Sequence, residues 1–148
     1  MVCLGNICRS PLAEGILKQK CSQKGLDWII DSAATGNFYH FGAPPDKRSI
    51  AIGKKYGFDI SEQEARRINS SDFETFDLIF AMDLPVYQHL LKWALDEAEA
   101  QKIKLIMDEV YPGEVMQVPD PYFDNDGFEK VYRMLDEACG KIIEKYEP

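Results

Sequence analysis

Apolar side chains recur along the chain with two different spacings, which separate the segments that form helices from those that form strands. Apolar positions three or four residues apart predict four helices, at residues 11–24, 46–56, 87–98 and 128–146. Short, mostly apolar runs predict four strands, at residues 1–3, 28–30, 78–82 and 103–107. Because the two kinds of segment alternate, we expect an α/β fold: one doubly wound sheet of four mostly parallel strands, flanked by helices on both faces.

Capping residues mark several of the predicted helix boundaries. Ser10, followed by a proline, has the residue type that opens a helix, and Gly25 has the type that ends one. Serine followed three residues later by glutamate forms a capping-box pattern at Ser61 and again at Ser71. No Pro/Gly/Ser-rich linker and no internal repeat interrupts the sequence, so we expect residues 1–148 to form a single domain. The first predicted strand has only residues 1–3, so we expect it to be truncated or else very short.

The charge balance narrows the classes of partner. The chain carries 17 Lys and Arg against 25 Asp and Glu, a formal net charge of −8. Nucleic-acid binding needs clustered positive charge, so this balance argues against it. No apolar run approaches the roughly 20 residues of a membrane helix, and no secretory signal is visible. We therefore expect a cytoplasmic protein that binds neither nucleic acid nor a membrane.

Four cysteines are present, at positions 3, 8, 21 and 139. The chain is neither short nor rich in cysteine, so a reducing compartment with free thiols is the better expectation. No C-x-x-C pair occurs and the two histidines stand alone, so a zinc site is not indicated. Residues 124–127 resemble part of a calcium loop, but the position of its bidentate acid falls on Arg133. We predict no metal and no cofactor.

Residues 3–10 carry the strongest chemical signal in the chain. Cys3 ends the first predicted strand, Arg9 lies six positions later, and Ser10 opens a helix. Parallel sheets bind ligands beyond the carboxyl ends of their strands. A loop that enters a helix N-terminus turns backbone N–H groups inward and binds an anion, and an arginine fork fits two phosphate oxygens. This segment therefore predicts a phosphate site.

The same segment favours nucleophilic attack on the bound phosphate. A helix N-terminus and a nearby arginine favour the thiolate form of a cysteine, which is the nucleophilic form. The bare cysteine–arginine spacing also occurs by chance, and Cys3 alone fits a small buried residue at a strand end. The strand before the loop, Gly5 and Asn6 within it, and the helix after it favour a functional site.

Residues 3–11 resemble the phosphate-binding loop of the low molecular weight protein tyrosine phosphatases. The resemblance returns, in the family's order, over nearly the whole chain, at residues 12–14, 31–35, 44–46, 65–66, 80–83 and 120–122. Such an ordered set is far more specific than the cysteine–arginine spacing alone. It implies an enzyme that hydrolyses protein phosphotyrosine and aryl phosphates through a phosphocysteine, without metal or cofactor.

The resemblance also implies roles for individual residues. Cys3 is the nucleophile, Arg9 stabilises the transferring phosphate, and Asp120 protonates the leaving oxygen and then acts as base toward water. From spacing alone, Asp120 also fits an ordinary turn residue beside two prolines. The phosphate-binding loop and its supporting residues are Leu4, Gly5, Asn6, Ile7, Cys8, Ser10 and Ser32.

Within that set, the resemblance implies that Asn6 holds the strained loop backbone, Ser32 bonds to Asn6, and Ser10 bonds to the thiolate. Taken alone, Ser10 fits a helix cap and Ser32 a solvent-facing serine. Cys8 is implied to form a reversible disulfide with Cys3, which protects the nucleophile from irreversible oxidation. Taken alone, Cys8 fits a buried thiol.

Aromatic side chains are candidate walls of the cleft, because an aryl phosphate needs apolar flanks beside its anion site. By the resemblance they are Phe38, Tyr39, Tyr122 and Phe123. Packing beneath a long loop remains the alternative for at least two of them.

Residues 62–64 stand where family members often carry a histidine, so the resemblance implies that the hydrogen-bond network around Asn6 is altered.

Other functions remain open. Arsenate reductases share the loop but need two more cysteines in mid-chain, and none lies between Cys21 and Cys139. Phosphocarrier subunits of sugar transport systems have a similar loop but do not need Asp120, and a silent phosphotyrosine-binding module fits the short first strand. Ile7 resembles the tyrosine-directed members, whereas arginine phosphatases of the family tend to carry threonine there. The expected partners are a phosphotyrosine-containing protein and, by analogy, an opposing tyrosine kinase.

Overall fold

The computed structural model describes residues 1–36 and 40–148. Its four strands form one parallel sheet, in the order β2 (Ala33–Ala34), β1 (Val2–Cys3), β3 (Ile79–Ala81) and β4 (Ile103–Leu105). Val2 is paired with Ala33 on one side and with Ala81 on the other. The strand that ends at Cys3 is therefore central, where both neighbours fix its direction.

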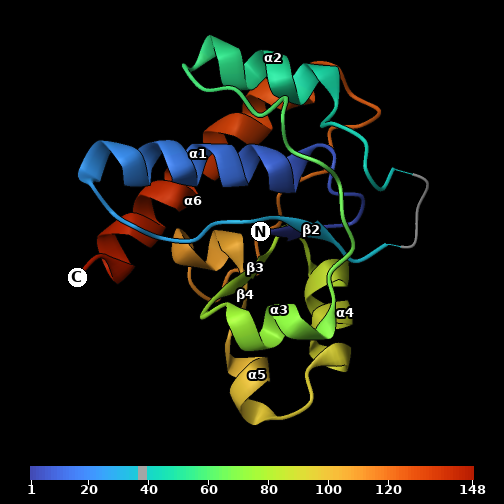
Figure 1. Cartoon of the computed structure of the whole chain (residues 1–148), viewed down its shortest axis with the longest axis vertical. Coiled ribbons are helices and arrows are strands. Elements are labelled where there is room, and N and C mark those ends of the chain that lie inside the picture. The colour runs from blue at the N-terminus through green and yellow to red at the C-terminus, as the bar shows by residue number, and fades with distance from the viewer. Residues whose placement is uncertain (37–39) are drawn as a thin grey trace.

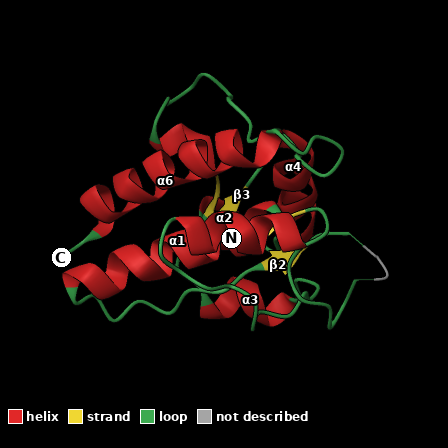
Figure 2. Ribbon diagram, turned by 90° about the horizontal axis from the view of Figure 1, so that it is seen from above, coloured by secondary structure: helices red, strands yellow, loops and turns green. Residues whose placement is uncertain are grey.

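The helices lie on both faces of this sheet (Figure 1). In chain order they are α1 (Arg9–Lys24), α2 (Lys47–Lys55), α3 (Ser70–Thr75), α4 (Leu84–Trp93), α5 (Glu97–Gln101), the 3₁₀ helix η1 (Ile106–Glu109) and α6 (Gly127–Tyr146). Figure 2 shows α1 and α6 lying side by side, and α2 packs against both. This arrangement confirms the predicted doubly wound α/β fold.

Alternation along the strands divides the buried side chains between two cores. Ile79 and Ala81 face the core formed with α3 and α4, whereas Phe80 and Met82 face the core formed with α1 and α6. Because successive strand residues point to opposite faces, one short apolar strand serves both cores. The continuous apolar run at residues 78–82 follows from this double burial.

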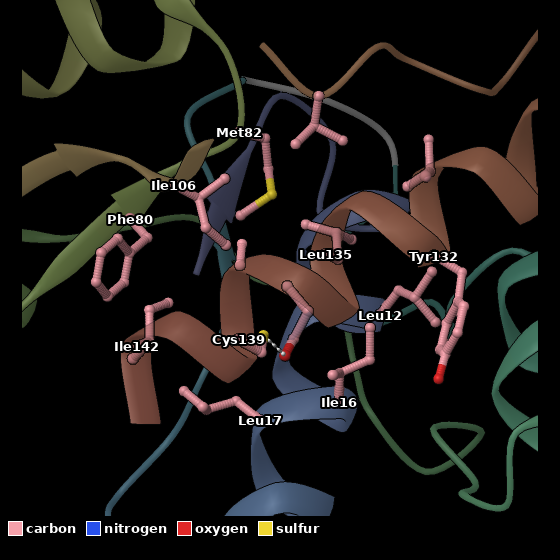
Figure 3. Close-up of a cluster of buried hydrophobic side chains, with 14 of the residues drawn as sticks. Leu12, Ile16, Leu17, Phe80, Met82, Ile106, Tyr132, Leu135, Cys139 and Ile142 are labelled. Carbon is pink, nitrogen blue, oxygen red and sulfur yellow. Dashed lines mark hydrogen bonds between the residues drawn. The ribbon is translucent and has the colours of Figure 1, made fainter. Parts of the chain in front are cut away.

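The larger core joins α1 to α6 (Figure 3). Leu12 and Ile16 on α1 and Leu135 on α6 are fully buried, and each such side chain stabilises the fold by about 1.5–3 kcal/mol. The Cys139 thiol donates to the carbonyl of Ala13 at 3.7 Å. The helix that carries Arg9 at its start is thereby held against the C-terminal helix along its length.

The predicted strand at residues 28–30 is wrong, because the edge strand is Ala33–Ala34. The amide N–H of Ala33 donates to the carbonyl of Met1, and that of Thr35 donates to the carbonyl of Cys3. The strand thus forms where the chain meets the backbone of β1, and its small side chains leave no apolar run to reveal it. Ile29 is 82% exposed, so the apolar run itself is only partly buried.

The predicted helix at residues 87–98 is two helices. Helix α4 ends at Trp93, and Asp96 caps α5 by accepting from the N–H of Glu99 at 2.9 Å. Leu95 lies between the two helices and is 82% exposed. It fits the helical spacing of apolar residues, but it is not buried as that spacing predicts.

The two predicted capping boxes also differ from the structure. Residues 61–64 start no helix. The box at the start of α3 consists of Asn69 and Asp72, two residues earlier than expected. Within the described residues, no helix is long and apolar enough to span a membrane.

Candidate active site

Residues 3–10 turn tightly from the end of β1 into α1, and Asn6 stands at the centre of the turn. Its φ of 56° lies in the left-handed region, which asparagine tolerates better than most residues. Its Nδ2 donates to Ser10 Oγ at 2.8 Å and to Ser32 Oγ at 2.9 Å, and its Oδ1 accepts from the N–H of Arg66 at 3.0 Å. One side chain therefore joins the loop to α1 and to two other segments.

The sulfur of Cys3 is buried among hydrogen-bonding groups. The N–H of Asn6 donates to Sγ at 3.2 Å, and Ser10 Oγ lies 3.0 Å from Sγ. Since Ser10 Oγ already accepts from Asn6 Nδ2, its own hydrogen is free to point at the sulfur. Two donors aimed at Sγ stabilise a negative charge there.

Arg9 is buried beneath the loop, with only 3% of its surface exposed. Its Nη1 donates to Asp83 Oδ2 at 2.6 Å and to the carbonyl of Val118 at 3.0 Å. Burial alone would lower the pKa of Arg9, but the neighbouring Cys3 and the hydrogen bond that Arg9 donates to Asp83 outweigh it, so the pKa is raised. Within the described part of the chain, Nε and Nη2 have no hydrogen-bond partner, which leaves one edge of the guanidinium for an oxyanion.

Asp120 approaches the same place from the segment before α6. Its Oδ2 lies 3.9 Å from Arg9 Nη2, and its Oδ1 accepts from the N–H of Tyr122 at 3.1 Å. Its side chain is 49% exposed. The carboxylate is therefore near the guanidinium and open to solvent, a suitable position for exchanging a proton with a bound ligand or water.

A pocket of about 240 Å³ brings these residues together. Its lining consists of Cys3, Leu4, Gly5, Ile7, Cys8, Arg9, His40, Asp120, Tyr122 and Phe123. The rings of Tyr122 and Phe123 meet edge to face, with centroids 4.9 Å apart, and Phe123 is 95% exposed. The volume is close to the lower end of small-ligand pockets, and its mouth is aromatic.

The remaining predicted residues are placed as follows. Ser32 is buried next to Asn6 and does not face solvent. Cys8 is a free, buried thiol, and burial raises its pKa to about 12. Phe38 and Tyr39 lie outside the described residues.

Three residues of this region were missed at the level of sequence. Asp83 accepts from Arg9 and also caps α4, by accepting from the N–H of Val86 at 3.0 Å. Arg66 anchors Asn6 through its backbone, and His40 lines the pocket. The position of Asp83 directly after a buried strand was a usable signal, because ligand sites lie at strand ends. A backbone donor such as that of Arg66 leaves no such signal.

Comparison with known proteins identifies the family. The family model described as low molecular weight phosphotyrosine protein phosphatase matches residues 1–147. The chain belongs to this family. A low molecular weight phosphotyrosine protein phosphatase of Homo sapiens is 36% identical over 148 residues, which cover 97% of this chain and 92% of the relative.

Solved structures of the family superimpose on this member closely. A protein tyrosine phosphatase from Entamoeba histolytica is 41% identical, with a TM-score of 0.90 over 99% of this chain and 94% of that chain. A Drosophila arginine phosphatase is 34% identical, with a TM-score of 0.91 over 99% of this chain and 96% of that chain. The same family fold therefore occurs in proteins named for two different phosphorylated residues.

Proposed function

We propose that this chain hydrolyses phosphotyrosine in proteins, and other aryl phosphates, through a phosphocysteine at Cys3. Its family membership makes it a protein tyrosine phosphatase. The main observation that supports this mechanism is that Cys3, Arg9 and Asp120 line one pocket, whose mouth is aromatic.

In the first step, Cys3 Sγ attacks phosphorus. The S–P bond forms while the bond from phosphorus to the aryl oxygen breaks, and the proton of Asp120 goes to that oxygen. The free edge of Arg9 and the loop N–H groups stabilise the charge on the three non-bridging oxygens. The donors on Cys3 Sγ, from Ser10 and Asn6, support this role because they stabilise the sulfur as an anion.

In the second step, water replaces the sulfur. Asp120, now a carboxylate, takes a proton from the water as its oxygen bonds to phosphorus and the S–P bond breaks. Inorganic phosphate leaves, and both Cys3 and Asp120 return to their initial states. The solvent exposure of Asp120 supports this step, because water must reach it.

The surroundings of the pocket support the substrate and partner expectations. Tyr122 and Phe123 line the pocket, and in our proposal they flank the aryl group. The natural substrate is a phosphotyrosine-containing protein, and a tyrosine kinase is the enzyme class that must supply it. Four free thiols among the described residues suit a reducing, cytoplasmic setting.

Cys8 provides the redox protection that we propose for the nucleophile. Under oxidation, the Cys3 thiolate attacks a peroxide and becomes a sulfenic acid as the O–O bond breaks and the other oxygen leaves as water or an alcohol. The Cys8 sulfur then loses its proton and bonds to Cys3 Sγ, and the sulfenic oxygen leaves as water. The Cys8 pKa of about 12 supports a resting thiol at neutral pH, so Cys8 does not compete with Cys3 as nucleophile.

Phosphoarginine hydrolysis is the second candidate. It is favoured by the similarity to the Drosophila arginine phosphatase. Against it stands Ile7 in the pocket lining, since the family resemblance implies that arginine-directed members tend to carry threonine there.

The test is release of phosphate from a phosphotyrosine peptide and a matched phosphoarginine peptide, with a metal chelator present. Wild type is expected to act on the phosphotyrosine peptide, and Cys3→Ser to lose on the order of 10⁶-fold in kcat, as other enzymes do without their nucleophile. Full activity in Cys3→Ser would contradict the mechanism. Peptide binding without turnover in wild type would favour a binding module, and faster turnover of phosphoarginine would favour the second candidate.

A further inference from the structure

Helix α2 begins directly against the proposed anion loop, residues 3–10. The N–H of Asp46, the cap of α2, donates to the carbonyl of Ile7 at 2.8 Å. The hydroxyl of Ser49 donates to the carbonyl of Cys8 at 3.0 Å. Two backbone carbonyls of the loop are thus bonded to the first turn of α2, so this turn moves with the loop.

Arg48 is fixed to the same helix start by its own cap residue. Its backbone N–H and Nε donate to Asp46 Oδ1 at 2.8 and 2.9 Å, and its Nη2 donates to Asp46 Oδ2 at 2.9 Å. Both carboxylate oxygens therefore engage the arginine, which fixes the plane and direction of the guanidinium. A surface arginine held by a single bond would not be oriented in this way.

The opposite side of the guanidinium meets the acid loop, residues 120–126. Its Nη1 donates to Asn125 Oδ1 at 2.7 Å. Its central carbon lies 5.6 Å from the ring centroid of Tyr122 and 4.5 Å from that of Phe128, at the start of α6. At these distances the guanidinium is attracted to the faces of both rings. Tyr122 in turn donates its N–H to Asp120 Oδ1.

We propose that Arg48 is a positioning residue for Asp120. It ties the acid loop, through Tyr122 and Asn125, to the helix start that holds the anion loop, and so sets the distance between Asp120 and the phosphate bound over Cys3. The inference rests on the proposed function. Arg48 does not line the pocket, so it acts through the loop and not on substrate.

The alternative is a structural ion pair without catalytic consequence. Exposed ion pairs contribute little to stability, so stability alone does not separate the two roles. The dependence of the cleavage rate on the leaving group does separate them. A displaced general acid slows cleavage of a poor leaving group, which needs a proton, and hardly affects a good one. A general loss of folded protein slows both equally.

The experiment measures kcat/KM for phenyl phosphate and for 4-nitrophenyl phosphate with wild type, Arg48→Met, Asp120→Asn and the double variant. We expect Arg48→Met to lose about ten-fold on phenyl phosphate and less than about two-fold on 4-nitrophenyl phosphate. In the Asp120→Asn background, Arg48→Met should cost less than about two-fold on either, because its effect requires the acid. The inhibition constant of inorganic phosphate should stay within about two-fold of wild type, since the anion loop keeps its own bonds.

Arg133→Met is the matched control, because Arg133 lies on the exposed surface of α6, 75% exposed in its side chain. It should leave both substrates unchanged. Asn125→Ala removes one bond of Arg48 from an exposed position, so it tests the same contact without risk to the fold and should show a smaller loss of the same selectivity. Equal losses on both substrates, or the same loss with and without Asp120, would overturn the inference. A wild type without Cys3-dependent turnover would overturn the proposed function and this inference together, whereas turnover that Arg48→Met and Asn125→Ala leave unchanged overturns the inference alone.

Discussion

The anion loop and the acid loop supply the two halves of one proposed reaction, but the structure holds them in opposite ways. In the anion loop, Asn6, Arg9 and Ser10 are each at most 3% exposed. In the acid loop, the Asp120 side chain is 49% exposed and Phe123 is 95% exposed. One loop is built into the core, and the other lies on the surface.

The difference agrees with the task that we propose for each loop. Charge that develops on phosphate oxygens is stabilised best by donors that are already oriented and shielded from water, so the anion loop is buried and cross-bonded. A group that passes a proton to a leaving group and later takes one from water must be reached by both. Burial suits the first task and exposure the second. Damage to the two loops should therefore have different consequences for stability and for activity.

Asp120→Ala is expected to combine a large loss of activity with a small loss of stability. Removal of a general acid costs about 10²–10⁴-fold, so kcat/KM for phenyl phosphate should fall by that factor. Because the side chain is half exposed, the free energy of unfolding should change by less than about 0.5 kcal/mol. Steady-state kinetics and urea unfolding of the same preparation check both halves of this prediction. An unchanged rate on phenyl phosphate would remove Asp120 from the mechanism.

Asn6→Ala should instead damage both stability and activity. The variant places alanine at a φ of 56° and removes the partners of Ser10, Ser32 and the Arg66 N–H. We expect a loss of about 2–4 kcal/mol in the free energy of unfolding, from the left-handed backbone and the unpaired buried groups together. Phosphate binding should weaken as well, because the loop N–H groups lose their fixed direction.

Urea unfolding and the inhibition constant of inorganic phosphate measure these two effects. Asn125→Ala is the matched control on the exposed loop, with an expected change in stability of about 0.5 kcal/mol or less. Equal stability losses for the two asparagines would contradict the contrast between a buried and an exposed loop.

The same contrast explains which parts of the site could be predicted from the sequence. The anion loop is contiguous: strand end, turn residues, arginine and helix start all fall within residues 3–10. Its chemistry can therefore be predicted from a short stretch of sequence. Asp120 looked like an ordinary turn residue, and only the family resemblance singled it out. Arg48 contacts Asn125 across 77 positions, and local pattern contains no signal for that contact. Asp83 contacts Arg9 across 74 positions, and its place directly after a buried strand was the one local signal that it belongs to the site.

The fold divides in a similar way. The strand β3 was predicted because burial on both faces makes a continuous apolar run, and β4 was predicted from apolar residues on either side of Lys104. The strand β2 was misplaced, because Ala33 and Ala34 are small and their role depends on backbone bonds to β1. The boundary between α4 and α5 was missed because Leu95 continues the helical spacing of apolar residues, although its side chain is exposed in the structure.

The smallest expected effect concerns Asp46, which lies between the two loops. Hydrogen bonds from Arg48 lower the pKa of Asp46 below its usual value of 3.8. A carboxyl group whose pKa is lowered in the folded state stabilises that state at pH values above 3.8, and this contribution is lost as the pH falls through the folded-state pKa. Asp46→Asn keeps a cap oxygen but removes the charge, so it should cost about 1 kcal/mol at pH 7.

The difference in stability between wild type and Asp46→Asn should then shrink below pH 4, since the wild-type carboxyl becomes neutral as well. Urea unfolding at pH 7 and at pH 3 measures it. A difference that stays constant with pH would mean that the charge of Asp46 does not contribute, and that the first turn of α2 is held by its cap oxygen and backbone bonds alone. In that case Arg48 would depend less on Asp46 for its orientation, and its link between the two loops would have to rest on Asn125 and the aromatic rings.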